Sequence, residues 1–158
     1  MKKIASFEVD HLRLLRGLYV SRHDPIGNEW VTTFDIRMKA PNREPVLDMP
    51  ALHSIEHLGA TWLRNHRDWG EKVIYFGPMG CRTGCYLLVH GRYESEDVLA
   101  LLIQLFQYIA DFRDAIPGAS DKECGNCFSH DLPMAAWESR KFLEEVLKTA
   151  GQDQLHYS

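Results

Sequence analysis

The chain lacks any long apolar run. Apolar residues make up 45% of its 158 positions, but no stretch approaches the roughly 20 that a membrane-spanning helix needs. The opening segment MKKIASFEVD reaches Glu8 and Asp10 before an apolar segment can form, which is unlike a secretory signal peptide. We therefore expect a cytoplasmic protein with no membrane partner.

Runs of basic residues are also missing. Lys and Arg number 18 against 22 Asp and Glu, so the formal net charge is -4 at pH 7. Without a basic cluster, neither nucleic acid nor an anionic membrane surface is an expected partner. Internal repeats and interdomain linkers are absent as well. We expect a single domain over residues 1–158, with a polar, frayed tail at residues 152–158.

Cysteine is sparse, at four residues beside eight histidines. With no secretion signal these thiols are expected to be reduced, and reduced cysteines serve in catalysis or metal binding more often than in disulfides. Cys85 begins the apolar segment CYLLV and is interpreted as core packing.

Alternation of apolar and polar residues predicts an antiparallel sheet of about four strands. The segment Trp30–Met38 places Phe34 and Ile36 on a core-facing side and Arg37 on the opposite side. The other expected strands are Ser6–His11, Val73–Phe76 and Cys85–Val89. The last two are joined by the glycine-rich segment GPMGCRTG, which predicts a yielding hairpin.

Three segments have helical periodicity. Asp48 is expected to cap a helix that runs to about Arg67, and Ser95 begins a second helix with a broad apolar face. A third helix is expected after Asp131, running to Thr149. Strands and helices in this order predict an α+β fold, with the sheet packed against helices in a single compact domain.

The strongest local signal is HSIEH, His53 to His57, inside the first predicted helix. Residues four apart lie on one helix face, roughly 5–6 Å apart, so the two imidazoles can converge on one metal ion. Glu56 lies beside them, within reach for proton transfer at the same ion. A pair of surface histidines is the plainer interpretation, but all three residues flank the apolar stripe, which favours a metal site.

Two histidines from one helix leave other coordination positions to be filled. Cys124 and Cys127 form a C-x-x-C pair, which could complete a closed structural site. Alternatively, one thiolate binds and the fourth position stays open to a substrate oxygen. His130 and Asp131 are interpreted as the start of a helix rather than as part of a site.

Cys81 discriminates between these two possibilities. It lies in the glycine-flanked hairpin next to Arg82, and an exposed thiol near positive charge is favoured as a thiolate. A structural metal site has no use for such a residue, although an isolated cysteine is about as often an ordinary core residue. Together with HSIEH, the setting of Cys81 favours catalysis.

Six blocks occur in the order and at about the spacing of one known family: SFEVDH, FDIR, HSIEH, GPMGCRTG, ECGN and HDL. From Ser6 to the third predicted helix, the chain therefore resembles the S-ribosylhomocysteine lyases, the LuxS family. The resemblance implies a homodimer of small α+β subunits with active sites at the interface. It also implies one divalent metal per subunit, natively Fe(II), with Zn or Co also possible.

The resemblance assigns roles to individual residues. His53, His57 and Cys124 match the metal ligands, with a water or substrate oxygen in the fourth position. Glu56 and Cys81 match the two acid/base groups. The residues that match the lining of the substrate pocket are Ser6, His11 and Arg37.

The reaction implied is the cleavage of S-ribosyl-L-homocysteine to L-homocysteine and 4,5-dihydroxy-2,3-pentanedione, the autoinducer-2 precursor. The ribose carbonyl moves along the sugar by proton transfers, and homocysteine then leaves by β-elimination. A metal polarises the carbonyl oxygens, and two proton carriers are needed because one group cannot reach every carbon. The early transfers fall to Cys81 and the later one to Glu56.

One position departs from the family. Tyr75 stands where many members carry an aspartate that faces the amino-acid end of the substrate, so homocysteine recognition is expected to be rearranged. Cys127 falls where the family uses no ligand, which favours the open metal site. Two other functions stay open: a zinc hydrolase of the inverted H-x-x-E-H type, in which Glu56 activates water, and a non-catalytic zinc-stapled binding module.

Overall fold

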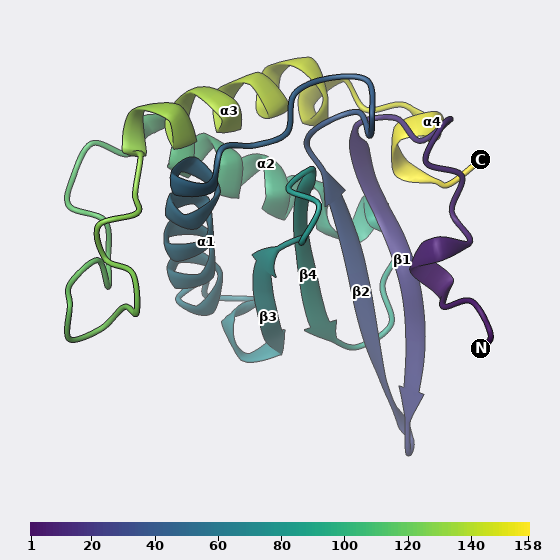
Figure 1. Cartoon of the computed structure of the whole chain (residues 1–158). Helices are drawn as coiled ribbons and strands as arrows, with labels where there is room; N and C mark the ends of the chain where they lie inside the picture. Colours follow the sequence, from purple (N-terminus) through teal and green to yellow (C-terminus); the bar gives the residue numbers. More distant parts are fainter.

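Four strands form one antiparallel sheet. The computed structural model describes residues 1–158, and its sheet has the spatial order β1-β2-β4-β3 (Figure 1). The strands are β1 (Gly17–Ile26), β2 (Glu29–Arg37), β3 (Val73–Pro78) and β4 (Gly84–His90). This order places β4, which directly follows the hairpin that carries Cys81, beside β2 in the middle of the sheet.

The α-helices are α1 (Met49–Arg64), α2 (Ser95–Asp111), α3 (Leu132–Glu145) and the short α4 (Gln152–Leu155). Single 3-10 turns form at Ala5–Phe7, Gly70–Lys72 and Leu147–Thr149. In Figure 1, α1 lies next to β3, while α4 lies near β1 together with both ends of the chain. None of these helices combines the length and apolarity that crossing a membrane requires.

The core lies between the sheet and the longer helices. Phe34 and Ile36 of β2 and Leu87 of β4 are fully buried, as are Ile55 and Leu58 of α1. Full burial of one such side chain contributes about 1.5–3 kcal/mol. Because α1 is fixed through this apolar face, the histidines that flank the face are held in place.

The predicted fold class is confirmed, and most elements lie where the periodicity places them. The strands β2, β3 and β4 match their predicted ranges closely, and Cys85 is fully buried in β4. α1 ends at Arg64, somewhat before the predicted Arg67, and Asp48 occupies its N-cap position without a side-chain hydrogen bond. The Asp131 side chain caps α3 by accepting from the backbone N–H of Met134 at 3.0 Å.

The helix predicted to run to Thr149 ends earlier. α3 stops at Glu145, and Val146, with φ −125° and ψ −67°, leaves the helical conformation. The remaining residues form the separate 3-10 turn Leu147–Thr149.

The predicted strand Ser6–His11 is wrong. This segment forms a 3-10 turn at Ala5–Phe7 followed by further turns, and the His11 ring lies 2.8 Å from the carbonyl oxygen of its near neighbour Val9. Phe7 is 69% exposed, so the alternation of apolar residues here does not face a core.

The first strand is β1, which the sequence analysis missed. Asp24, Pro25 and Gly27 are turn-forming residues, yet β1 continues to Ile26 and pairs with β2 along its length. An edge strand can contain proline because one side of its backbone has no strand to bond. β1 is such an edge strand.

The tail at residues 152–158, for which the sequence predicts a frayed end, includes α4 and packs against the sheet. Leu155 is 5% exposed, and the ring of Tyr157 stacks on Tyr19 of β1 with centroids 4.7 Å apart. The Tyr157 hydroxyl donates to Asp35 of β2 at 2.7 Å. The ring and hydroxyl of Tyr157, together with the buried Leu155, therefore hold the tail against the sheet.

The face of β2 opposite the helices is also buried. Arg37 points away from the main core, as predicted, but Arg37 and Asp35 are only 3% and 1% exposed. The tail supplies part of this cover through the contact of Tyr157 with Asp35. Two charged side chains thus lie inside the protein as a pair.

Candidate functional site

Two histidines of α1 form the centre of a candidate metal site. The rings of His53 and His57 lie one turn apart, with centroids separated by 4.6 Å. Nδ1 of His53 donates to the carbonyl oxygen of Ser129 at 2.7 Å, and Nδ1 of His57 donates to that of Pro117 at 2.8 Å. Each bond fixes the ring and leaves Nε2 with a free lone pair, as metal-binding histidines require.

A close backbone approach makes the bond to His57 possible. Gly118 has a φ of +70°, in the left-handed region that favours glycine. A Cβ at Gly118 would lie 3.4 Å from Nδ1 of His57. Glycine at this position therefore lets the carbonyl of Pro117 lie directly against the ring.

The loop before α3 brings Cys124 to the two histidines. The Cys124 sulfur lies 3.5 Å from Nε2 of His53, and the backbone N–H of Asn126 donates to it at 3.4 Å. The backbone N–H of Cys124 donates to the carbonyl of Ser120 at 2.9 Å, which holds the loop in a turn. A sulfur that already accepts an N–H hydrogen bond is suited to carrying negative charge.

His130 belongs to the same cluster, which the sequence analysis missed by assigning it to a helix start. Its ring stacks on His53 with centroids 4.0 Å apart. Burial, together with the charges of His53 and His57, lowers the pKa of His130. No spacing pattern could reveal this residue, because it reaches the histidines of α1 only through the fold of the loop.

The His130 ring contacts α1 through Ser54. Nδ1 of His130 lies 3.1 Å from the Ser54 hydroxyl oxygen. That oxygen also accepts from the backbone N–H of Asp131 at 3.0 Å and lies 3.0 Å from the carbonyl oxygen of Pro50. Nε2 of His130 is buried and has no hydrogen-bond partner in the protein.

These donors fit a divalent transition metal. Ligand atoms of His53, His57, Cys124 and His130 lie within 4.8 Å of one another. Imidazole nitrogen and thiolate sulfur suit Zn, Fe and Co, whereas Mg and Ca prefer oxygen. Cys127 is outside this group, so the closed site made of two histidines and both cysteines does not form.

Glu56 lies on the same turn of α1 and faces a cavity of about 220 Å³. His53 and Glu56 line one side of this cavity, and Met79, Gly80 and Arg82 line the other. The charge of Glu56 also contributes, after burial, to raising the pKa of Tyr75. The cavity thus joins the metal-binding helix to the hairpin that carries Cys81.

Cys81 is exposed, as predicted, and its hairpin is held by backbone hydrogen bonds. The backbone N–H groups of Met79 and Arg82 donate within the turn, and the carbonyl of Arg82 accepts from the N–H of Leu47 at 2.9 Å. Arg82, rather than a glycine, takes the positive φ of 60°. At Gly84 a Cβ would collide with the carbonyl of Ile36, so this glycine permits close strand packing.

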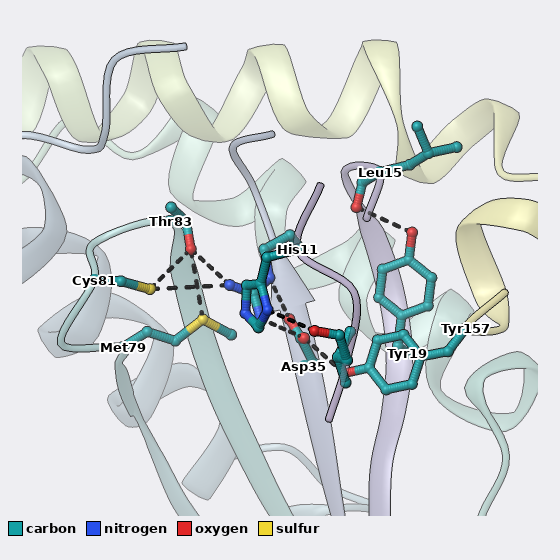
Figure 2. A network of polar contacts seen from close by, with 10 residues as sticks. His11, Leu15, Tyr19, Asp35, Met79, Cys81, Thr83 and Tyr157 are labelled. Atoms are coloured by element: carbon teal, nitrogen blue, oxygen red, sulfur yellow. Dashed lines mark hydrogen bonds and ion pairs between the residues drawn. The ribbon is translucent and has the colours of Figure 1, made fainter. Parts of the chain in front are cut away.

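A second arginine, Arg37 of β2, also brings positive charge to the thiol. Nη1 of Arg37 lies 3.9 Å from the Cys81 sulfur and donates to the Thr83 hydroxyl at 2.7 Å. Its other nitrogens bind both carboxylate oxygens of Asp35, at 3.0 and 2.6 Å. Burial lowers the pKa of Arg37, but the charge and hydrogen bonds of Asp35 outweigh it and raise that pKa above its usual value. Figure 2 shows Cys81 and Thr83 side by side within this network.

The remaining sequence-predicted residues lie in different places. Nδ1 of His11 lies 2.8 Å from the carbonyl oxygen of Val9 in the N-terminal segment (Figure 2). Ser6 lines a separate cavity of about 360 Å³ on the outer face of the sheet, together with Tyr75 and Tyr86. Within one chain, Ser6 is therefore next to Tyr75 but not among the residues of the metal cluster.

The family model that matches this chain and three of its relatives are named for the same enzyme. A family model described as S-ribosylhomocysteinase (LuxS) matches residues 4–153. A protein of Phocaeicola vulgatus named S-ribosylhomocysteine lyase is 59% identical over 99% of this chain and 98% of its own length. Proteins of the same name from Porphyromonas gingivalis and Clostridium beijerinckii are 55% and 52% identical, each over 99% of both chains.

Proposed function

Because the chain belongs to the LuxS family, we propose that it is a metal-dependent lyase that cleaves S-ribosyl-L-homocysteine to L-homocysteine and 4,5-dihydroxy-2,3-pentanedione. One observation carries the proposal beyond the family name. The cavity between α1 and the Cys81 hairpin has His53 and Glu56 on one wall and Met79, Gly80 and Arg82 on the other. A substrate there would contact Glu56 and the proposed metal ligand His53, next to the two residues that flank Cys81 in the hairpin.

The proposed metal ligands are His53, His57 and Cys124, with one divalent ion per subunit. Fe(II) is the proposed native ion, and the donor set also suits Zn and Co. When bound, the ion supplies a Lewis acid that polarises carbonyl oxygens of the substrate. We place His130 beside the ion rather than on it, because a fourth protein ligand would close the position that the substrate needs.

Cys81 and Glu56 are the proposed proton carriers. Moving the carbonyl along the ribose requires that a proton leave the carbon next to each carbonyl and return to the carbon that was the carbonyl. A thiolate at Cys81, close to the Arg37 guanidinium, is suited to these early transfers. Glu56, on the wall of α1, is suited to removing the proton whose loss expels the homocysteine thiolate and forms the new double bond.

Substrate binding is proposed to involve Ser6, His11 and Arg37. Ser6 shares its cavity with Tyr75, and the charge of Glu56 acts on the Tyr75 hydroxyl. This supports a position for Tyr75 between the two cavities, near the amino-acid end of the substrate. A neutral phenol cannot pair with an ammonium group as a carboxylate does, so main-chain groups near Phe76 are the proposed replacement.

The proposed working form is a cytoplasmic homodimer with an active site at each interface. The N-terminal segment exposes large apolar side chains, with Ile4 56%, Phe7 69% and Leu12 78% exposed. Such clusters on a single protein commonly mark an interaction surface. Sedimentation of the purified protein is expected to give twice the mass of one chain, and a monomer at micromolar concentration would contradict this part of the proposal. Its product would enter autoinducer synthesis and quorum sensing.

The two other functions have less support. A zinc hydrolase would use Glu56 to activate water, but it has no task for the thiol of Cys81 or for the arginine beside it. A zinc-stapled binding module would use Cys127, which lies outside the cluster of ligand atoms.

Release of homocysteine tests the proposal. Protein reconstituted with Fe(II) or Co(II) is mixed with S-ribosylhomocysteine, and the new thiol is followed with a thiol-reactive dye. We expect continuous release, which Glu56→Gln abolishes. A hydrolase would release no thiol from this substrate, and the same result would be expected of a stapled binding module.

A further inference from the structure

A continuous line of polar contacts connects the end of the chain with the Cys81 thiol (Figure 2). It runs from the Tyr157 hydroxyl to Asp35, from Asp35 to Arg37, from Arg37 to Thr83, and from Thr83 to the sulfur. The interior part of the line, Asp35, Arg37 and Thr83, is 1–5% exposed. We propose that Thr83 donates the hydrogen bond that holds the Cys81 thiolate, and that Tyr157 and Asp35 are positioning residues for that bond.

At the thiol end of this line, the chemistry of the side chains determines which group donates in each hydrogen bond. Arg37 has no acceptor atom, so its Nη1 must donate to the Thr83 hydroxyl oxygen at 2.7 Å. The single proton of Thr83 is then free for the Cys81 sulfur at 3.0 Å. The other sulfur within reach is that of Met79, at 3.9 Å, and it is a weak acceptor. A charged thiolate is the stronger acceptor of the two, so the Thr83 proton favours it.

Thr83 therefore links the Arg37 guanidinium to the Cys81 sulfur through two hydrogen bonds. The direct contact from Nη1 of Arg37 to the Cys81 sulfur is long, at 3.9 Å, whereas both bonds through Thr83 are 3.0 Å or shorter. A hydroxyl that accepts from a cation becomes a better donor to an anion. The hydroxyl, more than the direct contact, is the group that orients and holds the thiolate.

Tyr157 acts at the far end of the line. Asp35 is buried and receives three hydrogen bonds, two from Arg37 and one from Tyr157 at 2.7 Å. Burial and the charge of Asp35 raise the pKa of Tyr157, which keeps its proton in place as a donor. Without that hydroxyl the carboxylate would be less compensated, and its uncompensated charge would oppose a thiolate nearby.

The tail is built to hold this hydroxyl in place. The Tyr157 ring stacks on Tyr19 at an interplanar angle of 18°, and the Tyr19 hydroxyl donates to the carbonyl of Leu15 at 3.0 Å. Leu155 is buried two residues earlier. The tail is thereby connected to the Cys81 thiol only through Asp35, Arg37 and Thr83, so we assign its residues a positioning role rather than a catalytic one.

The inference rests on the proposed function only for the use made of the thiol, and its test does not need turnover. Metal-loaded protein without substrate is treated with iodoacetamide over a range of pH, and modification of the Cys81 peptide is followed by mass spectrometry. Loss of a hydrogen bond to a charged group is expected to lower the thiolate fraction about tenfold. In Thr83→Val the midpoint of the alkylation profile should therefore rise by about one pH unit.

Matched variants separate this effect from loss of structure. Thr83→Ser keeps the hydroxyl and should restore the wild-type midpoint. Tyr157→Phe keeps the stacked ring and should raise the midpoint by a smaller amount, corresponding to a change of about two- to threefold. Tyr108→Phe serves as the control, because Tyr108 packs on Phe112 in the helical layer and has no hydrogen bond to Asp35.

The outcomes are distinguishable from those of the proposed function. A midpoint that is the same in wild type and Thr83→Val, or one that Thr83→Ser does not restore, overturns the inference even if the wild type releases homocysteine. A midpoint that moves as expected supports the inference even in a protein that releases none, and in that case only the proposed function fails.

Discussion

The metal side of the candidate site and its thiol side are built in different ways. The metal side takes two histidines from one helix, four residues apart, and adds Cys124 and His130 from a single loop. The thiol side takes Asp35 and Arg37 from β2, Cys81 and Thr83 from the hairpin, and Tyr157 from the tail. One side depends mainly on local spacing and the other on strand pairing across the sheet.

This difference decides how each side responds to change. The metal side is a cluster of imidazole and thiol ligand atoms within 4.8 Å of one another, and its proposed function depends on the metal. The thiol side is fully paired within the protein, with the Asp35 and Arg37 pair buried at its centre. Its function depends on the fold remaining closed. The predictions below separate the two, starting with the largest expected effect.

The largest effect is expected for a metal ligand. Removing a group that only hydrogen-bonds a metal ligand already weakens metal binding about 10- to 100-fold, so loss of a ligand itself in His57→Ala should exceed the upper figure. Metal content, measured by elemental analysis after dialysis, should fall to nearly none, and homocysteine release should stop. His66→Ala, two residues beyond the end of α1 and outside the cluster, is the control and should keep its metal. A His57→Ala protein that retains a full metal complement would remove this residue from the ligand set.

The proton carriers should lose turnover and keep the metal. A positioned acid/base group contributes about 10²–10⁴-fold to a rate, and two carriers act in succession here. Cys81→Ala and Glu56→Gln are therefore each expected to lower homocysteine release to the limit of detection, with metal content unchanged. Cys127→Ser is a matched thiol control with normal release. Full activity in either variant would exclude the role given to that residue.

The buried ion pair should matter for stability. Asp35→Asn leaves the guanidinium of Arg37 buried without a charged partner, and breaking a buried pair in this way costs about 3–5 kcal/mol. Urea denaturation should show this loss as an earlier midpoint with an unchanged slope. Asp68→Asn removes a partner of Arg67, a pair whose arginine side chain is 90% exposed, and should leave the midpoint unchanged. Equal midpoints in both variants would mean that the thiol side does not depend on this pair.

The smallest effect is expected at Cys127. It lies three residues from Cys124 but outside the group of ligand atoms, so Cys127→Ala should change neither the metal content nor the unfolding midpoint. Loss of metal together with the fold in this variant would instead indicate a closed structural site. In that case the metal would stabilise the fold and would not take part in catalysis.

The parts of the molecule that depend on local sequence could be predicted. α1 and its two histidines follow from 3.6-residue periodicity, and the paired strands β3 and β4 follow from short apolar segments around a glycine-rich turn. The alternation in Ser6–His11 has the same period as a strand, but no partner strand faces it. Alternation within a segment does not show whether a partner strand lies next to it in space, which is why this prediction is wrong.

The parts that depend on distant contacts could not be predicted. Tyr157 and Asp35 are 122 positions apart in the sequence, and the tail has too few apolar residues to suggest that it packs. His130 has no ligand spacing of its own and joins the metal cluster because the loop folds back onto α1. Arg37 was assigned to the site by family resemblance alone, and its burial against Asp35 follows from the tail that covers it.

The most direct measurement of the central claim is homocysteine release under two metal conditions. The protein is stripped with a chelator, divided, and assayed with S-ribosylhomocysteine before and after reconstitution with one equivalent of Co(II) per chain. We predict no thiol release from the stripped protein and sustained release from the reconstituted one. Absence of release from fully reconstituted, folded protein would contradict the assignment of a metal-dependent lyase.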